Sequence, residues 1–131
     1  MDTLCAVLMG WAVTLSPYPA PADCPEIQFV DREELQRLAC DGGNCRVAGF
    51  VTYKNPATVY AWDQMDMGNP LARSIIVHEM VHILQLEHGS LHADSSCEDK
   101  IQAEREAYMV QDQYLMQYGR IRETASPAEC H

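Results

Sequence analysis

Five residues in the middle of the chain have the types and spacing of a metal centre with an acid–base group beside it. They read His78-Glu79-Met-Val-His82. On a helix, positions i and i+4 share a face, so both imidazoles can reach one ion. Zinc accepts imidazole nitrogen at about 2.0–2.1 Å. Glu79 lies next to the metal and could take a proton from activated water and later deliver it to a leaving amine. The motif predicts zinc on His78 and His82, with Glu79 as catalytic base.

The local sequence places this motif in the middle of a buried helix. Asn69 is a good N-cap and Pro70 suits the first helical position, so we expect a helix from there to about Glu87, closed by His88 and Gly89. Between residues 75 and 86 the apolar side chains fall on nearly every side, which is typical of a buried helix. The alternative, two core histidines with a buried glutamate, would desolvate three polar side chains without a reason.

A catalytic zinc needs a third protein ligand and an open position. Glu104 is the preferred candidate, because it falls within a stripe at helical spacing that we expect to pack on the core of a last helix, at about residues 98–118. Glu106 lies about 200° round that helix from Glu104 and is expected to face solvent, but it stays an alternative. The downstream candidates are His88, His92, Asp94, Glu98, Asp99, Glu104 and Glu106.

Tyr108 follows Glu104 by one helical turn and is a second candidate catalytic residue. Its hydroxyl could orient a ligand or donate a hydrogen bond to an oxyanion formed during attack. Core packing of the ring is an equally good explanation. His88 and His92 could play the same part from the loop that follows the motif helix.

Length and charge limit the classes of function. The chain has 131 residues, which suits one domain, and a formal net charge of −10. Nucleic acids and anionic membranes attract basic surfaces, so neither is expected as a main partner. A peptide or protein substrate fits the predicted site.

The N-terminus predicts export. Residues 4–15 are twelve uncharged, mostly apolar residues, too few to span a bilayer but suited to a signal peptide. Ala20 and Ala22 precede a plausible cleavage site, so we expect a signal peptide over residues 1–22, a single domain over residues 23–131, and a secreted or periplasmic protein without stable membrane insertion. A buried N-terminal helix is the alternative.

In an oxidising compartment most of the cysteines should pair. Cys40 and Cys45 flank a turn-forming Asp-Gly-Gly-Asn stretch, and a Cys97–Cys130 bridge would tie the tail to the loop after the motif helix. Once the leader is removed, Cys24 is left over, although sequence alone does not fix the connectivity.

The remaining patterns predict an α+β domain. Residues 27–30 are a strand candidate, followed by a short helix that Asp31 caps and that ends near Cys40. Residues 46–53 and 58–62 flank an Asn-Pro turn and predict a β-hairpin. With the motif helix and the last helix, these elements give a small antiparallel or mixed sheet and helices.

The His78-Glu-Met-Val-His82 motif, followed by Glu104-Arg-Glu-Ala-Tyr108, resembles the gluzincin metallopeptidases. In that family the third zinc ligand is a glutamate on a downstream helix, four residues before an Asp, Asn or similar residue. The resemblance therefore implies zinc held by His78, His82 and Glu104. Tyr108 departs from the family pattern.

The chain also looks like a group of small bacterial proteins whose metallopeptidase function is inferred. The resemblance covers about residues 24–118, with its matching stretches at residues 39–47, 73–85 and 104–115. It implies a minimal zincin fold, with a small sheet, the motif helix beneath it and the ligand helix behind. Residues 58–62 would then form the edge strand beside the site, where peptides often bind by strand addition. A non-catalytic, zinc-stabilised binding module is the rival function.

Overall fold

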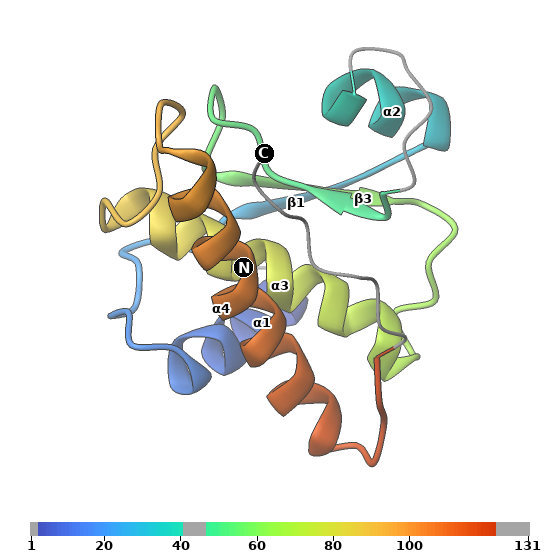
Figure 1. Cartoon of the computed structure of the whole chain (residues 1–131). Helices are drawn as coiled ribbons and strands as arrows, with labels where there is room; N and C mark the ends of the chain where they lie inside the picture. The colour runs from blue at the N-terminus through green and yellow to red at the C-terminus, as the bar shows by residue number, and fades with distance from the viewer. Residues whose placement is uncertain (1–2, 41–46, 123–131) are drawn as a thin grey trace.

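A small mixed sheet separates one short helix from three longer ones in the computed structural model, which describes residues 3–40 and 47–122 (Figure 1). Helix α2 packs on one face of the sheet and α3 on the other, with α1 and α4 against α3. The predicted α+β class is confirmed. The elements are α1 (Thr3–Leu15), β1 (Glu26–Val30), α2 (Arg32–Cys40), β2 (Gly49–Phe50), β3 (Thr58–Trp62), α3 (Pro70–Glu87) and α4 (Cys97–Met116).

The sheet has the order β1-β3-β2. Strand β2 pairs antiparallel with β3, which confirms the predicted hairpin, and β1 pairs with β3 in parallel, with Ile27 opposite Val59. The prediction of residues 58–62 as an edge strand is therefore wrong. Thr58, Val59 and Ala61 are all buried, as expected of a central strand, because β1 covers the side of β3 that the hairpin leaves open.

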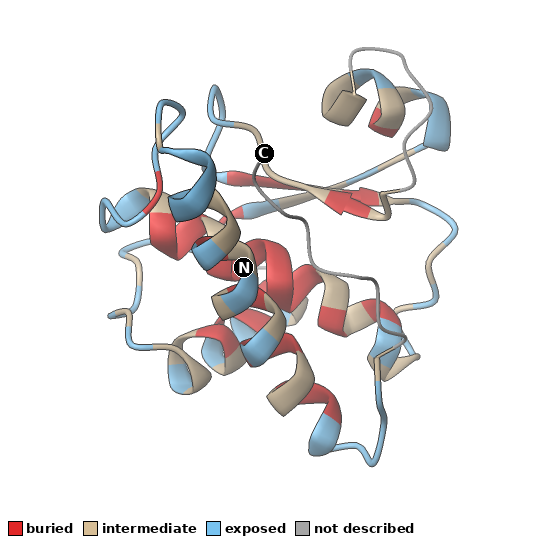
Figure 2. Cartoon of the chain, viewed as in Figure 1, coloured by how far each residue is buried: buried red, intermediate tan, exposed pale blue. Residues whose placement is uncertain are grey.

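Helix α3 forms the centre of the molecule and follows the predicted bounds. The Asn69 side chain accepts a hydrogen bond from the backbone of Leu71 at 3.0 Å, and Pro70 opens the helix. His88 follows as the C-cap, and Gly89 has a positive φ of 80°. Figure 2 shows the buried residues concentrated on α3 and on the sides of α1 and α4 that face it. Both histidines and Glu79 therefore lie on a helix that its neighbours fix from several sides.

Helix α4 packs on α3 through a face that only partly matches the predicted stripe, of which Gln111 and Leu115 are buried. Ala103, Ala107, Val110 and Tyr114 are buried there. Small side chains at the first two positions let the backbones approach closely. Glu104 lies beside this face instead of within it, and its side chain is 47% exposed. The ligand candidate therefore borders the core and reaches solvent.

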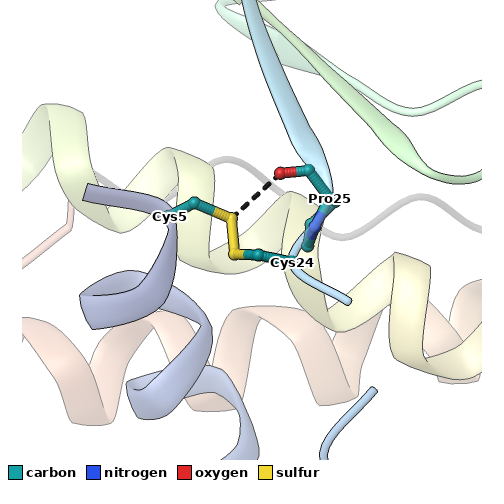
Figure 3. Close-up of a disulfide and its surroundings, with 3 residues drawn as sticks. All are labelled: Cys5, Cys24 and Pro25. Carbon is teal, nitrogen blue, oxygen red and sulfur yellow. Dashed lines mark hydrogen bonds between the residues drawn. A yellow bond between two sulfur atoms is a disulfide. The ribbon is translucent and has the colours of Figure 1, made fainter. Parts of the chain in front are cut away.

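Most of the segment predicted as a signal peptide, Thr3–Leu15, forms α1 in this structure. Four of its side chains are buried, Cys5, Leu8, Met9 and Ala12. Cys5 forms a disulfide with Cys24, the cysteine expected to be left over, and its sulfur also contacts the carbonyl oxygen of Pro25 (Figure 3). Cleavage after residue 22 stays a prediction, and it would remove α1 together with this disulfide.

Two further features bear on the predicted location. Cys40 and Cys97 also take part in disulfides, whereas their predicted partners, Cys45 and Cys130, lie outside the described residues. Within residues 3–40 and 47–122, no helix has the length and apolarity needed to cross a membrane.

Candidate metal centre

Three side chains from two helices meet at one point. His78 and His82 project from adjacent turns of α3, and Glu104 reaches them from α4. His78 Nε2 lies 3.2 Å from His82 Nε2 and 3.1 Å from Glu104 Oε1, and the same carboxylate oxygen contacts His82 Nε2. One ligand atom from each residue lies within 4.8 Å of the others, so the group could hold a metal ion.

The spacing of these atoms fits a tetrahedral ion. Bonds of about 2.0–2.1 Å from zinc to nitrogen would place neighbouring ligand atoms about 3.3 Å apart at tetrahedral angles. The distances of 3.2 Å between the two imidazole nitrogens and 3.1 Å from His78 to Glu104 are close to that value. The contact between His82 and Glu104 is shorter than this value, so the Glu104 carboxylate would have to move away from His82 to admit zinc.

The orientation of the His78 ring is set by a hydrogen bond at Nδ1, the ring nitrogen that faces away from the other two possible ligands. Its Nδ1 lies 2.9 Å from Oε1 of Gln111, whose amide nitrogen donates to Ser74 Oγ at 3.1 Å. The Ser74 hydroxyl donates in turn to the carbonyl oxygen of Leu71 at 2.7 Å. Because an amide oxygen can only accept, Nδ1 must carry the proton, which leaves the lone pair of Nε2 directed at the ligand group.

His82 is held in the same way by a second glutamine. Its Nδ1 lies 2.8 Å from Oε1 of Gln85. The Gln85 amide nitrogen donates to the carbonyl oxygen of Ala103 at 2.9 Å and to Glu106 at 3.0 Å. Both of those partners only accept, so the amide orientation of Gln85 is fixed. The two histidines therefore present matching tautomers, with both Nε2 atoms available to an ion.

The charges around the group favour a cation. Burial would lower the pKa of His82, but its hydrogen bond to Glu104 and the nearby carboxylates outweigh burial and raise that pKa to about 9. Burial would raise the pKa of Glu104, yet hydrogen bonds to His78 and His82 lower it well below its ordinary value. Without metal the site therefore binds a proton tightly, and a divalent cation would replace it.

Glu79 lies beside the ligand group without belonging to it. Its carboxylate oxygen is 3.9 Å from His78 Nε2, and its side chain is 12% exposed. Burial is the main cause that raises the pKa of Glu79, against the opposing effect of the two histidines. In the described part of the chain this carboxylate accepts no hydrogen bond, so it is available to a substrate or to water.

Tyr108 packs against the imidazole ring of His78. Its ring lies 4.4 Å from the His78 ring, and the Arg122 guanidinium covers it at 4.2 Å. Burial, followed by the charge of Glu104, raises the pKa of the Tyr108 hydroxyl, which therefore stays protonated at neutral pH. The ring packs on His78 instead of lying in the core, and the side chain lines the cleft, while a hydrogen bond from its hydroxyl to an oxyanion stays a prediction.

The ligand group opens into a cleft of about 540 Å³. Helix α3 forms its floor, α4 one wall, and residues 47–51 with Tyr53 the other wall. Most of the remaining lining is apolar: Val51, Ile75, Leu86 and Leu91. The cleft is large enough for several residues of an extended peptide.

The other predicted ligands lie elsewhere. Among the described residues, the only group of three or more potential metal ligands is His78, His82 and Glu104. His88 stacks on Tyr18 instead. Glu106 was expected to face solvent, but it is half-buried and accepts hydrogen bonds from Gln85 and Tyr18. Tyr18 belongs to the segment that follows α1. The candidates outside the group are His88, His92, Asp94, Glu98, Asp99 and Glu106.

Three residues of the site were not identified from sequence. Gln85 and Gln111 orient the imidazoles, and Gly49 approaches Glu79 closely. The sequence pattern could have indicated a role for Gln85, because it is a polar residue one turn after His82 in an otherwise apolar run. Gln111 belonged to the predicted stripe without a role, and Gly49 had no distinguishing pattern.

Comparisons with known proteins add a family and no activity. Searches of curated proteins and of solved structures gave no match to this chain. A family model described as a domain of unknown function, DUF6647, matches residues 1–124, which include α1, the HExxH helix and Glu104. The chain therefore belongs to the DUF6647 family.

Proposed function

We propose that this protein is a zinc-dependent peptidase, with a zincin-like arrangement of its motif and ligand helices. The observation that carries the proposal is the combination of three possible ligand atoms, the adjacent carboxylate of Glu79 that is not part of the ligand group, and an open cleft. A site that only stabilises the fold needs a fourth protein ligand and no carboxylate at the position of Glu79. Among the described residues no fourth ligand joins the group.

Zinc is the metal that this ligand set favours. Two imidazoles and one carboxylate are a known set for catalytic zinc, whereas magnesium and calcium prefer oxygen ligands alone. The fixed tautomers of His78 and His82 support the same choice. We expect one zinc ion per chain.

Zinc, when bound, would supply the Lewis acidity that lowers the pKa of water and polarises a carbonyl group. Glu79 then acts as general base toward the attacking water and returns the proton to the leaving amine. Its raised pKa suits both steps, because a carboxyl group that titrates closer to neutrality exchanges protons more readily. Tyr108 donates a hydrogen bond to the oxyanion, so Tyr108→Phe should lower kcat and leave zinc binding unchanged.

A peptide would bind along strand β2, the edge strand beside the cleft. The carbonyl oxygen of Ala48 accepts a hydrogen bond from the backbone N–H of Trp62 at 2.9 Å. In an antiparallel pair, residues that bond to the neighbouring strand alternate with residues whose backbone groups point away from it. Gly49 therefore directs its own N–H and C=O away from β3. Those two groups can pair with an extended peptide.

Peptides and proteins of the extracytoplasmic space are the proposed substrates. The disulfides support a secreted or periplasmic location, since thiols of cytosolic proteins are kept reduced. The net charge of −10 does not favour nucleic acid or an anionic membrane as partner.

The test compares Glu79→Gln with Glu87→Gln, an exposed glutamate of the same helix. The parent and both variants should hold one zinc per chain by elemental analysis. Glu79→Gln should cleave a fluorogenic peptide library at least about 100-fold more slowly, and Glu87→Gln should match the parent. Equal cleavage by Glu79→Gln would contradict the mechanism. A zinc-loaded parent that cleaves nothing but unfolds on chelation would instead support a structural zinc site.

A further inference from the structure

Among the described residues that line the cleft beside the candidate metal centre, one side chain other than the two histidines is basic. Lys100, in the first turns of α4, lines the cleft four residues before Glu104. Every other charged group that the described part of the lining contains is an acid or an imidazole. A cation in this position is unexpected, because the protein carries 19 acidic and 9 basic residues, of which only Lys54 and Lys100 are lysines.

Among residues 3–40 and 47–122, Lys100 has no acidic partner. Its Nζ lies 5.7 Å above the ring of Tyr53, and within the described residues it makes no ion pair and no side-chain hydrogen bond. Arg37 and Arg122, by contrast, pair with Glu34 and Asp112. Glu104 is one turn away, but its Oε1 contacts both imidazoles. The ammonium group is therefore held over an aromatic ring at the cleft, with its hydrogen-bond donors unused.

Resting on the function proposed above, we infer that Lys100 binds a carboxylate of the peptide substrate and thereby selects anionic substrates. Four residues of helix correspond to about 6 Å along the axis, and an extended peptide spans about 3.3 Å per residue. The carboxylate would thus lie one to two residues from the scissile bond. The positive end of the α4 dipole adds to the attraction. Both a C-terminal carboxylate and an acidic side chain have this chemistry.

The experiment measures binding, so that it does not depend on turnover. Three mercaptoacetyl dipeptides, whose thiolate binds zinc, serve as probes. The first is Leu-Leu with a free C-terminal carboxylate, the second Leu-Glu amide, and the third the neutral Leu-Gln amide. Calorimetry with the zinc-loaded full chain compares the parent, Lys100→Met and Lys54→Met. Lys54→Met is the control, because it changes the net charge by the same amount as Lys100→Met. Lys54 is exposed and does not line the cleft.

We expect the first or second probe to bind the parent about tenfold more tightly than the neutral one at low salt. Lys100→Met should abolish the difference, Lys54→Met should keep it, and added salt should reduce it. Preference for the first probe alone indicates a C-terminal carboxylate, and preference for the second alone an acidic side chain.

Two results would overturn the inference. Equal binding of all three probes to the parent, or a preference that survives in Lys100→Met, would refute the role of Lys100 and leave the proposed peptidase function intact. If no probe binds although zinc is present, the open metal position is absent, and the proposed function fails together with the inference.

Discussion

Gly49 of the edge strand lies directly against the side chain of Glu79. A Cβ atom at residue 49 would come within 3.1 Å of Glu79 Cγ and 3.0 Å of Ile75 Cγ2. Both distances are shorter than ordinary van der Waals contacts between carbon atoms, which begin near about 3.5 Å. The backbone of β2 therefore packs closely on Glu79, and any larger residue at position 49 would require the side chains of Glu79 and Ile75 to yield by a few tenths of an ångström.

We predict that Gly49→Ala displaces Glu79 or shifts β2. Zinc binding should persist, because neither residue is a ligand, while kcat of the proposed hydrolysis should fall at least about tenfold, since small displacements of a catalytic group are costly. Steady-state kinetics with parallel metal analysis checks this. The control is Gly10→Ala, since no atom lies within 4 Å of a Cβ at that exposed position of α1. An unchanged kcat in Gly49→Ala would show that Glu79 does not need this support.

Gln111→Ala should weaken zinc binding by about 10–100-fold, the usual cost of removing a group that orients a metal-bound histidine. The substitution leaves Nδ1 of His78 without its acceptor, so the imidazole loses its fixed tautomer. Competition with a chromophoric chelator gives the affinity. Gln102→Ala, an exposed position on the same helix, is the matched control and should bind like the parent. Equal affinities in both variants would contradict the orienting role.

The stability of the metal-free protein should fall as the pH rises. The pKa of His82 is about 9 in the folded protein against 6.5 for an ordinary histidine, despite burial, because of Glu104 and Glu79. Because the folded protein binds this proton more tightly than the unfolded chain, protonated His82 adds of the order of 3 kcal/mol to the free energy of unfolding below about pH 6.5. This contribution is lost as the pH rises through about 9. Zinc affinity should change oppositely, rising up to about pH 9, since the proton must leave first.

Denaturant unfolding after chelation, at about pH 6 and about pH 9.5, measures this dependence. His82→Gln should remove most of the pH dependence, and His92→Gln, at an exposed loop position, should retain it. Constant stability over this range in the parent would refute the assignment of the proton to His82.

A chain that begins at residue 23 should be less stable than the full chain. It lacks the buried side chains of α1 and leaves Cys24 without Cys5. The disulfide alone contributes about 3 kcal/mol for a loop of this length. Denaturant unfolding of the two forms, beside a full chain with Cys5→Ser and Cys24→Ser, separates the packing of α1 from the disulfide. Equal stability of the short and full chains would show that α1 is dispensable.

The site was predictable where its signals are local. Asn69, Pro70 and the histidine spacing lie within 14 residues, and each acts through neighbouring backbone or one helical face. Helical periodicity places Glu104 in a stripe that is expected to be buried, and Glu104 does join the histidines. Its actual place at the border of the core depends on how closely Ala103 and Ala107 approach α3, which helical periodicity does not reveal.

The sheet order and the supporting glutamines depend on contacts between distant segments. Val59 could be read as part of a hairpin strand, but its parallel partner Ile27 is 32 residues earlier, and no turn signal links the two. Gln111 contacts His78 across 33 positions, and an isolated glutamine on a helix gives no sign of such a partner. Long-range pairing and hydrogen bonding of this kind can be assigned only once the helices are placed.

Two of the proposed ligands lie on α3 and the third on α4, so the group that could hold an ion is complete only after these helices dock. In an unfolded chain only His78 and His82 of these three residues are close in sequence, so this three-residue site is absent before folding. Loading of the proposed site would therefore follow folding, and the compartment in which the chain folds would decide which ions it can acquire. For a protein that folds after export, the supply of ions is that of the surrounding medium.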